Sequence, residues 1–560
     1  MTETIFIGVA WPYANSPLHQ GQMVGSFLPA DVFARYHRLR GDRVLMVSGS
    51  DQHGTPVTVR AEQEGRSPQE IVDTFHKSFV QSLAWMGITM DTYTTTGTQN
   101  HRETVQSIFT KLHGQGDIYK DTMTLLYCPN DDRYLPDRYV EGTCPNCGYE
   151  QARGDECEQC SRALDAIELI NPRCKLCGTT PVPRESEHFF LRLSAYSDRL
   201  RDWVSKQGHW RKHVANFTLG VLNEGLRDRA ITRDLEWGIP LPIDELGPGK
   251  SIYVWFENVV GYLSASKEWA QQRGEPDAWR DFWQDPDCRS YYFLGKDNIF
   301  FHTLSWPVEI MAYGAADRAP LNLPYDVPAN HYNNFAGQKA SSSRATAVFI
   351  PDIIGRYDPD AFRYYLCATM PETADSDFTW QDFVARNNNE LVATWGNLVN
   401  RALTLTYRNF DGKVPDAGEL DDLSRALLDR TENVLGEVAE QLSGCHFRPA
   451  LSAAMGLAQE ANRFLDETAP WKALPDDRPS AARSLYAILC VINGLKVALW
   501  PFVPFSCERL HGDLGYGTAI TEHGWTLVRP EPGQALREPK PLFSKLEPAV
   551  ADEEDQRLAS

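Results

Sequence analysis

Apolar and polar residues alternate along the first fifty positions in the order expected of a strand, a helix and a second strand. Ile5 to Ala10 is an apolar run of strand length, and Asn15-Ser16-Pro17 is typical of a helix start. One buried helix face is then indicated by apolar residues four apart, at Val24, Leu28, Val32 and Tyr36. Gly41-Asp42 ends this helix, and Arg43 to Gly49 returns as a strand. This order predicts a parallel sheet, whose ligands bind beyond the carboxyl ends of its strands.

The α/β pattern stops between about residue 127 and residue 177, where Cys, Gly and charged residues dominate. After this insertion, the segments 251–255 and 290–294 are predicted to be returning strands of the sheet. From residue 382 onward the apolar positions keep helical spacing. One such helical stripe consists of Leu391, Trp395, Leu398 and Leu403, and longer helical segments are predicted over 423–442, 450–467 and 481–499. We therefore expect an α/β domain split by an insertion and followed by an all-helical domain.

Composition narrows the class of protein. At about 150 residues per domain, 560 residues correspond to three or four domains. Hydrophobic residues make up 42% and charged residues 23%, which excludes a disordered or fibrous chain. The net charge of −20 argues against loose coating of nucleic acid, so a polyanion is expected to be held at local basic places. The segment 384–413, with four basic and two acidic residues, has a net charge of +2.

Nothing in the sequence predicts secretion or a membrane span. The first four residues include no basic one, and Ile5 to Ala10 is too short for a signal core. The apolar stretch 487–505 is interrupted by Asn493, Lys496 and Pro501, and a span needs about 20 clean residues, so it is expected to be a buried helix. We expect a cytoplasmic protein whose twelve cysteines are metal ligands or core thiols. The acidic end of the chain, from Asp552, is predicted to be frayed.

Two C-x2-C pairs predict a structural zinc site. Cys144 and Cys147 form one pair, and Cys157 and Cys160 form the other. Four thiolates complete a tetrahedral zinc site and leave no open position for a substrate. A second set is less complete, because Cys174 and Cys177 form a knuckle while Cys128 is accompanied only by Asp131. A Cys3Asp zinc site is chemically possible there, since carboxylate oxygen also binds zinc. The remaining cysteines, Cys288, Cys367, Cys445, Cys490 and Cys507, are expected in the core.

Three polar segments near the predicted strand ends contain candidate ligand-binding residues. His19 is expected in the first turn of the helix, where backbone amides and an imidazole favour a phosphate. Asp297 follows the strand 290–294, where it can accept a hydrogen bond from a ribose hydroxyl. The loop from Lys339 to Arg344 contains small residues between two cations and is suited to closing over phosphates. The alternative for each residue taken alone is a purely structural role.

In this order and spacing, the motifs resemble the methionyl-tRNA synthetases, a family of class I aminoacyl-tRNA synthetases, from Ile5 to about Leu499. The stretches that carry the resemblance are Pro12-Tyr13-Ala14-Asn15, His53-Gly54-Thr55-Pro56, the knuckles from Cys144 to Cys160, Ser186-Glu187-His188-Phe189-Phe190, Tyr253-Val254-Trp255, Gly295-Lys296-Asp297 and Ala469-Pro470-Trp471. A zinc insertion inside a split nucleotide-binding domain is far more specific than any single motif. The resemblance implies a Rossmann-like catalytic domain and a ligase that activates methionine with ATP and then transfers it to tRNA.

The resemblance also implies roles for individual residues. The catalytic positions would be His19, Gln22, Lys339 and Ser342, and the nucleotide positions Gly21, Gly295, Lys296 and Asp297. Methionine would lie against Ala10, Trp11, Tyr13, Asp51, Trp255, Asn258, Tyr262 and His302, with Asp51 taking the ammonium group. Aromatic walls suit a polarisable thioether. In the helical domain, Asn397, Arg401 and Trp471 would read a CAU anticodon of tRNA(Met) by stacking and edge hydrogen bonds. Magnesium is expected with ATP.

The expected domain boundaries follow from these motifs. The catalytic domain would comprise 1–118 and 231–335, separated by the zinc-bearing insertion 119–230. A signature-loop region, 336–388, would precede the helical anticodon-binding domain, 389–545, and an acidic tail, 546–560. Because the chain ends soon after the helical region, we expect a monomer.

Four positions depart from the usual pattern of the family. Gln22 stands where the first signature has a second histidine, and Ser342 where the second has a second lysine. Trp11 and Asn258 stand where Leu and Ala are common, and Asn258 adds polarity to the pocket. Two alternatives to a methionine-tRNA ligase therefore remain at the level of sequence. One is a paralogue with an altered pocket, for inhibitor resistance or another pathway, and the other is a non-catalytic tRNA-binding protein. A zinc-ribbon DNA binder is disfavoured, because the knuckles interrupt an α/β domain.

Overall fold

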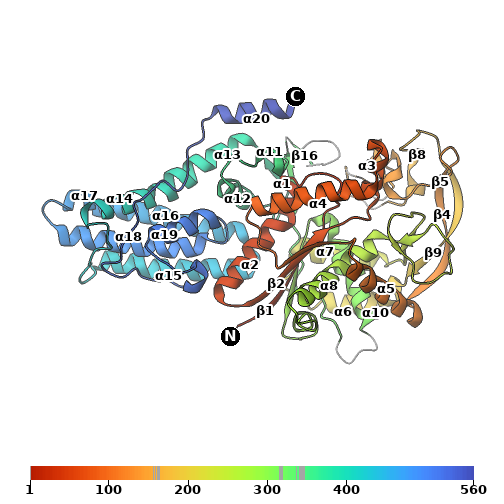
Figure 1. Ribbon diagram of the computed structural model, residues 1–560, viewed down its shortest axis with the longest axis horizontal. Helices are drawn as coiled ribbons and strands as arrows, with labels where there is room; N and C mark the ends of the chain where they lie inside the picture. Colours follow the sequence, from red (N-terminus) through yellow and green to blue (C-terminus); the bar gives the residue numbers. More distant parts are fainter. Residues whose placement is uncertain are drawn as a thin grey trace.

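A four-stranded parallel sheet lies at the centre of the computed structural model, which describes residues 2–154, 157, 159–160, 164–314, 320–335, 337–339 and 347–559. The strand order is β14 (Arg289–Phe293), β1 (Thr4–Val9), β2 (Arg43–Ser50) and β3 (Thr92–Thr95). In register, Ile7 of β1 lies opposite Met46 of β2 and Tyr291 of β14. Five of the six residues of β1 are buried, because strands on both sides and helices above and below cover it (Figure 1). The predicted parallel sheet is confirmed.

The helix after β1 begins later than its sequence suggests. Its cap is His19 rather than Ser16, and the chain then continues through α1 (Gln20–Gln22), a π-helical turn (Met23–Phe27) and α2 (Leu28–Arg40). Gly41, with φ of 85°, ends α2 in the left-handed conformation that glycine adopts without strain. The other helices of this domain are α3 (Thr55–Glu64), α4 (Pro68–Trp85), α5 (Gln99–Gln115), α8 (Val254–Gln272) and α10 (Trp306–Tyr313).

The predicted strand 251–255 is largely wrong. Of these residues, only Ser251 and Ile252 form a strand, β13, which pairs with β11 (Thr232–Arg233) and β12 (Ile239–Pro240) in a separate antiparallel sheet. Val254 already begins α8. The apolar positions continue beyond it at helical spacing, with Val259, Val260 and Leu263 buried, and this longer pattern overrides the local strand preference of Tyr253-Val254-Trp255.

The insertion is a long antiparallel ladder with the cysteine segments at its far end. β4 (Ile118–Cys128) and β9 (Val182–Leu191) pair from Ile118 opposite Leu191 to Tyr127 opposite Val182. Beyond them lie the short strands β5 (Arg133–Tyr134), β6 (Val140–Thr143), β7 (Ala152–Arg153) and β8 (Ile170–Cys174). In Figure 1 this ladder lies at the end of the molecule opposite the helical domain.

The helical domain has the elements that the apolar spacing predicts. α15 (Asp422–Ser443), α16 (Phe447–Thr468) and α18 (Arg478–Leu499) pack against one another, with α19 (Pro504–Asp513) beside α18. α13 (Trp380–Arg386), a π-helical segment (Asn387–Gly396) and α14 (Asn397–Asn409) follow without a break, so the expected boundary at 388/389 lies inside a helical run. Among the described residues, only α18 is long and apolar enough to cross a membrane, and 89% of its apolar window is buried within the protein.

The prediction of a frayed acidic tail is wrong. Residues Ala549–Ala559 form α20, which packs on α13. The Tyr357 hydroxyl donates to Glu554 at 2.5 Å, and the Gln381 amide donates to Asp555 at 2.7 Å. Ala551 is buried. Burial of this apolar position and two side-chain hydrogen bonds therefore order a segment whose acidic composition alone suggests solvation.

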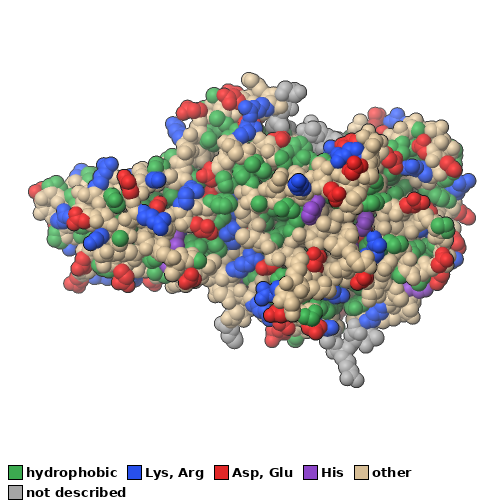
Figure 2. Space-filling model, viewed as in Figure 1, with side chains coloured by type: hydrophobic (Ala, Val, Ile, Leu, Met, Phe, Trp, Pro, Cys, Tyr) green, Lys and Arg blue, Asp and Glu red, His purple; other side chains and the backbone are tan. Residues whose placement is uncertain are grey.

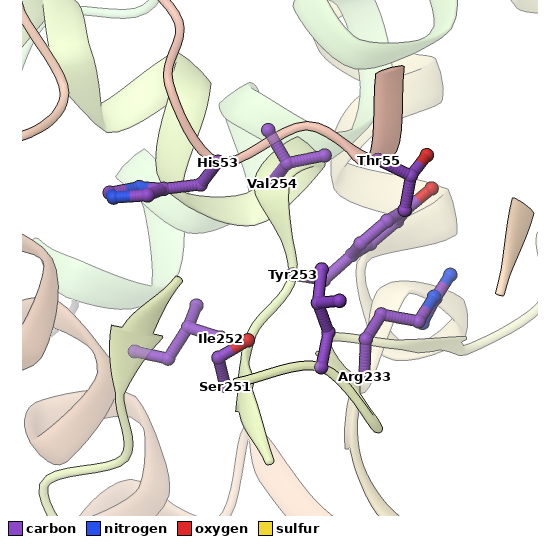
Figure 3. A pocket seen from close by; sticks show the side chains of 8 residues that line it. His53, Thr55, Arg233, Ser251, Ile252, Tyr253 and Val254 are labelled. Atoms are coloured by element: carbon purple, nitrogen blue, oxygen red, sulfur yellow. The ribbon is translucent and has the colours of Figure 1, made fainter. Parts of the chain in front are cut away.

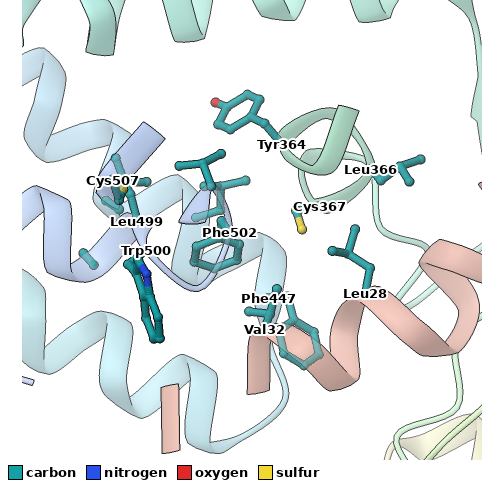
Figure 4. Close-up of a cluster of buried hydrophobic side chains, with 14 of the residues drawn as sticks. Leu28, Val32, Tyr364, Leu366, Cys367, Phe447, Leu499, Trp500, Phe502 and Cys507 are labelled. Atoms are coloured by element: carbon teal, nitrogen blue, oxygen red, sulfur yellow. The ribbon is translucent and has the colours of Figure 1, made fainter. Parts of the chain in front are cut away.

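Arg363 connects the catalytic and helical domains through a buried ion pair and hydrogen bonds to backbone carbonyls. Arg363 on α12 (Pro359–Ala368) is fully buried and donates to Asp31 of α2 at 2.8 Å and to the carbonyls of Met86, Pro501 and Phe502. Burial would raise the pKa of Asp31, but Arg35 and Arg363 outweigh this and lower it to about 2. Apolar side chains of α2, α12, α16 and α18 form one core across the two domains (Figure 4).

Asp31→Ala is expected to destabilise the protein by about 3 to 5 kcal/mol, because Arg363 would remain buried without its counter-ion. Urea unfolding followed by circular dichroism measures this loss. The control is Arg43→Ala, which breaks a pair with Asp281 at 2.7 Å in which both side chains are about half exposed. It is expected to cost less than about 1 kcal/mol. Equal losses in the two variants would contradict the assigned role of the buried pair.

Candidate active site and metal sites

The loops that follow β1 and β2 form one wall of the candidate site. The backbone N–H of Ala14 donates to the Asp51 carbonyl at 2.9 Å, and the N–H of Asp51 donates to the Pro12 carbonyl at 2.8 Å. The ring of Tyr13 lies directly over Gly54, where any Cβ atom would collide with it. Both loops lie at the carboxyl edge of the sheet, where the sequence places them.

Asp51 is a buried carboxylate with two protein donors. It is 1% exposed, and its Oδ2 accepts from the Asn258 amide at 2.6 Å. Its Oδ1 accepts from the backbone N–H of His53 at 3.2 Å. Burial and the nearby Glu257 carboxylate raise the pKa of Asp51 to about 8, although His53 and Asn258 act in the opposite direction. A carboxylate in this setting is ready to receive a cation, which would favour its charged form.

A second buried carboxylate, Glu257, is part of the site and was missed by the sequence analysis. Its oxygens lie 2.9 and 3.0 Å from Nδ1 of His53 and 3.3 Å from Nε2 of His101. Burial would raise the pKa of Glu257, but the two histidines outweigh it and lower that pKa. Burial alone would lower the pKa of His53, but Glu257 outweighs it and raises that pKa. Their positions in the sequence could have indicated them, because His53 lies two residues after Asp51 and Glu257 lies immediately before Asn258.

The aromatic residues predicted to bind methionine contact one another or other ring side chains. Trp255 stacks on Phe301 with ring centroids 4.0 Å apart and planes at 7°, and Tyr13 meets Trp255 edge-on at 6.1 Å. Tyr262 and Nε2 of His302 are hydrogen-bonded at 2.7 Å. Burial lowers the pKa of His302 to about 4, so its ring is neutral. Nδ1 of this ring faces the Asn298 carbonyl and carries the proton, which leaves Nε2 to accept from Tyr262.

Trp11 and Ala10 complete this part of the site. The Trp11 ring is buried against Gly49 of β2 and Gly261 of α8, and it stacks on His101 at 6.3 Å. A Cβ atom at Gly49 would collide with this ring, so glycine is required there. The N–H of Ala10 donates to the Phe293 carbonyl and joins β1 to β14.

His19 is an N-cap rather than a first-turn residue. Its Nδ1 accepts from the N–H of Gly21 at 3.1 Å, and the Gln22 side chain accepts from the N–H of His19 at 3.1 Å. Burial lowers the pKa of His19 to about 4, so the ring is neutral, with its proton on Nε2. The N–H groups of Gln20, Gly21 and Gln22 already have protein acceptors. In the described structure, an anion bound at the start of α1 would therefore accept a hydrogen bond from Nε2 of His19 rather than from these three amides.

The Gly295-Lys296-Asp297 segment follows β14 and lies beside residue 330. The Lys296 ammonium donates to Asp375 at 2.7 Å and lies 4.2 Å above the Tyr332 ring. The backbone N–H of Lys296 donates to the Asn330 carbonyl, and the Asn330 amide donates to Val24 next to α1. Asn330 therefore connects the predicted nucleotide segment to the helix that carries His19.

Both ends of the second signature loop are held close to His19. Lys339, in β16 (Gln338–Lys339), pairs through its backbone with Asn334 of β15 (Asn333–Phe335), and the Lys339 side chain lies outside the described part. Ser342 and Arg344 also lie outside the described residues. At the other end, the N–H of Val348 donates to the Gln20 side chain at 2.8 Å, and His19 bridges to Phe349. These contacts bring the two signature segments together.

The predicted anticodon residues share one end of the helical domain. The Arg401 guanidinium lies 5.1 Å above the Trp471 ring and donates to Asp466 at 2.7 Å, and Trp471 is 37% exposed. Asn397 lies one turn before Arg401 on α14. Arg386, by contrast, pairs with Asp382 and Glu390, so its charge is neutralised within the helical run. On the face seen in Figure 2, acidic and basic side chains are mixed over the helical domain.

Two clusters of side chains have the donor sets and geometry of zinc sites. Cys144, Cys147, Cys157 and Cys160 bring their sulfur atoms within 4.8 Å of one another, and so do the ligand atoms of Cys128, Asp131, Cys174 and Cys177. The contacts that define the second cluster are 3.5 Å between the sulfurs of Cys128 and Cys177 and 3.1 Å between Cys174 and Asp131. Four-coordinate zinc accepts thiolates with or without one carboxylate, so both sets fit this metal. The predicted core cysteines at 288, 367, 445, 490 and 507 are all buried.

A small pocket opens beside His53, between the loop after β2 and the start of α8 (Figure 3). His53, Thr55, Tyr253 and Val254 are among the residues that line it. Arg233 of β11 lies across the Tyr253 ring at 3.5 Å. Residues from both halves of the split domain therefore line this pocket.

Comparisons with known proteins agree on one family. A family model described as tRNA synthetases class I (M) matches residues 5–403, and one described as the anticodon-binding domain of methionyl tRNA ligase matches 414–560. A methionine–tRNA ligase from Dehalococcoides mccartyi is 55% identical over 558 residues and covers both chains fully. Another from Thermomicrobium roseum is 49% identical and covers 100% of this chain and 99% of its own. The structure of Mycobacterium tuberculosis methionyl-tRNA synthetase in complex with methionyl-adenylate aligns with a TM-score of 0.79 at 25% identity, covering 97% of this chain and 100% of that one.

Proposed function

Because this chain belongs to the methionyl-tRNA synthetases of class I, we propose that it is a methionine-tRNA ligase. It activates methionine with ATP as methionyl-adenylate and transfers the methionyl group to tRNA(Met). The observation that carries this proposal is the buried Asp51 carboxylate, which is hydrogen-bonded to Asn258 of α8, the helix that also carries Trp255 and Tyr262, and Trp255 in turn contacts Tyr13. The carboxylate suits an α-ammonium group and the aromatic rings suit a thioether, and methionine has both of these groups.

Methionine is recognised at its two ends. Asp51 accepts the α-ammonium, and the resulting ion pair offsets the unfavourable burial of the carboxylate. Tyr13, Trp255 and Tyr262 surround the side chain, where each contact between sulfur and an aromatic ring contributes about 0.3 to 1.5 kcal/mol. His302, held neutral by burial, fixes the Tyr262 hydroxyl and adds no charge to the pocket.

Activation depends mainly on positioning and on neutralising phosphate charge. The α-carboxylate oxygen of methionine attacks the α-phosphorus of ATP, and pyrophosphate leaves. His19 donates from Nε2 to a phosphate oxygen, with Gln22 supporting its backbone. Lys339 and Ser342 act from the second signature loop, while Gly21, Gly295, Lys296 and Asp297 form the nucleotide side of the site. Magnesium bound with ATP would supply further positive charge to the phosphates.

The helical domain binds the anticodon. Trp471 offers a half-exposed aromatic surface for stacking, and Arg401 and Asn397 offer donors for base edges. These three residues match family positions that read the CAU anticodon, which is the anticodon of tRNA(Met). This arrangement concentrates recognition at a few side chains, which suits a chain with a net charge of −20.

Zinc analysis of the purified protein is expected to give two equivalents. Cys144→Ser should remove the zinc of the first cluster, and Asp131→Ala should weaken the second, because the second set then has only three ligands. Mass spectrometry under native conditions measures both. Cys288→Ser, a core thiol outside both clusters, is the control and should retain both ions. One equivalent in the unmodified protein that Asp131→Ala leaves unchanged would contradict a Cys3Asp site.

Methionine-dependent exchange of pyrophosphate into ATP tests the proposed function. The purified protein is expected to catalyse this exchange, and His19→Ala with Lys339→Ala should lower it by at least about 10²-fold, as loss of transition-state contacts does elsewhere. Absence of exchange above that control, while tRNA with a CAU anticodon still binds, would identify a non-catalytic tRNA-binding protein instead.

A further inference from the structure

The loop after β2 and the first turn of α8 hold each other through two reciprocal hydrogen bonds. Asn258 of α8 donates to Asp51 of the loop at 2.6 Å. His53 of the loop donates to Glu257 of α8 at 2.9 Å. Each element thus supplies one donor and one carboxylate, and we refer to these four residues as the latch. Asp51, Asn258 and Glu257 are no more than 5% exposed, and the side chain of His53 is 11% exposed.

The latch places two carboxylates in one buried region, which is costly unless the charge of one is compensated. Glu257 has two imidazole partners, His53 from the loop and His101 from α5. Asp51 has a neutral donor, Asn258, and otherwise faces Glu257 and His53. Arg102, also on α5, acts on His53 in the direction that disfavours its charge. Glu257 is therefore compensated by two imidazole partners, whereas Asp51 is left to be compensated by the cation of a ligand.

Asn258 also restricts the direction of the Asp51 carboxylate. Its amide takes one lone pair of Oδ2, and the backbone N–H of His53 takes one of Oδ1. A carboxylate has about four lone-pair directions, so two remain for an ammonium group. A donor to the ionised form favours that form, which opposes the effect of burial on Asp51.

We propose that Asn258 positions Asp51 and, together with His53, which Glu257 holds in place, favours the ionised form of Asp51 that binds the α-ammonium of methionine. This inference rests on the proposed function and adds residues to it that act through Asp51 rather than by touching the reacting atoms. The latch matters most near neutral pH, because burial and Glu257 raise the pKa of Asp51 to about 8. Below that pH, binding of methionine must displace a proton from Asp51.

Two variants test the latch by steady-state pyrophosphate exchange. Asn258→Ala removes the donor, and the KM for methionine should rise about ten- to hundredfold with kcat changed by less than about threefold, as expected for loss of one hydrogen bond to a charged group. The acid limb of kcat/KM for methionine should move to higher pH. His53→Gln keeps a donor for Glu257 but removes the cation, so it should move the acid limb in the same direction. The KM for ATP should stay unchanged in both.

Glu268→Gln is the matched control. This residue lies on the same helix and accepts from Thr94 at 2.8 Å, away from the latch, so its methionine KM and pH profile should match those of the unmodified protein. Unchanged methionine KM and acid limb in both Asn258→Ala and His53→Gln would overturn the latch, and so would a fall in kcat at constant KM. Exchange that does not depend on methionine in the unmodified protein would instead overturn the proposed function.

Discussion

Asp51→Asn is expected to reduce kcat/KM for methionine in pyrophosphate exchange by about 10³-fold. Asparagine has nearly the same shape as aspartate but carries no charge, so the α-ammonium of methionine would enter a buried site without a counter-ion. Breaking a buried ion pair in this way costs about 3 to 5 kcal/mol, which corresponds to roughly 10² to 10⁴ in binding. Exchange rates across a wide methionine range separate KM from kcat, and most of the loss should appear in KM.

The same substitution is expected to stabilise the ligand-free protein at alkaline pH. The pKa of Asp51 is raised from its ordinary value to about 8 in the folded state, so the folded state binds this proton more tightly than the unfolded chain. Ionisation of the unfolded chain therefore lowers stability as pH rises from about 4 to about 8, at up to about 1.4 kcal/mol per pH unit. Asp51→Asn removes this dependence, and urea unfolding at pH 6 and pH 8.5 measures the difference.

The control for Asp51 is Asp281→Asn, which lies in an exposed pair with Arg43. It should leave the methionine KM unchanged and shift stability by less than about 1 kcal/mol at either pH. An Asp51→Asn protein with normal methionine KM would show that another group binds the ammonium. Equal stability of Asp51→Asn and the unmodified protein at both pH values would show that the carboxylate is not held at a raised pKa.

Trp471→Ala combined with Arg401→Ala is expected to lower kcat/KM for tRNA(Met) in aminoacylation by at least about 10²-fold. Stacking on an aromatic ring contributes about 1 to 3 kcal/mol per base, and the proposed role of the guanidinium held above this ring is to donate to base edges. Pyrophosphate exchange without tRNA should be unchanged, because the pair lies in the helical domain rather than at the parallel sheet. Comparing the two assays on one preparation therefore separates anticodon recognition from activation.

Arg430→Ala provides the matched control for this effect. Arg430 is an arginine of the same domain, on α15, where it pairs with Glu437 at 2.7 Å. It should change aminoacylation less than twofold. If it lowered aminoacylation as much as the double variant does, tRNA binding would depend on general positive charge. Loss of exchange in the double variant would indicate that these residues are needed for the fold instead.

Local sequence patterns determined the elements whose signal is long and periodic. The predicted helices 423–442, 450–467 and 481–499 correspond to α15, α16 and α18. An apolar stripe that keeps helical spacing over many turns fits a helix and no other regular structure. Short apolar runs were less reliable. Tyr253-Val254-Trp255 has strand-forming residues, but it begins a helix because the buried positions that follow keep a helical period. The acidic tail is ordered by contacts with α13 that its own composition does not reveal.

The sequence by itself also determined which chemical groups stand at the strand ends, including His19, Asp51 and Asp297, and which thiols can share a zinc ion. Only the tertiary structure decided the charge and the partners of these groups. Glu257 reaches His53 across 204 positions of sequence and His101 across 156, and Arg386 is neutralised by its neighbours. The amides at the start of α1 already have acceptors. The physical reason is that a charge, a pKa or a free donor depends on burial and on every group within a few ångströms, and these groups come from segments that meet only in the folded chain.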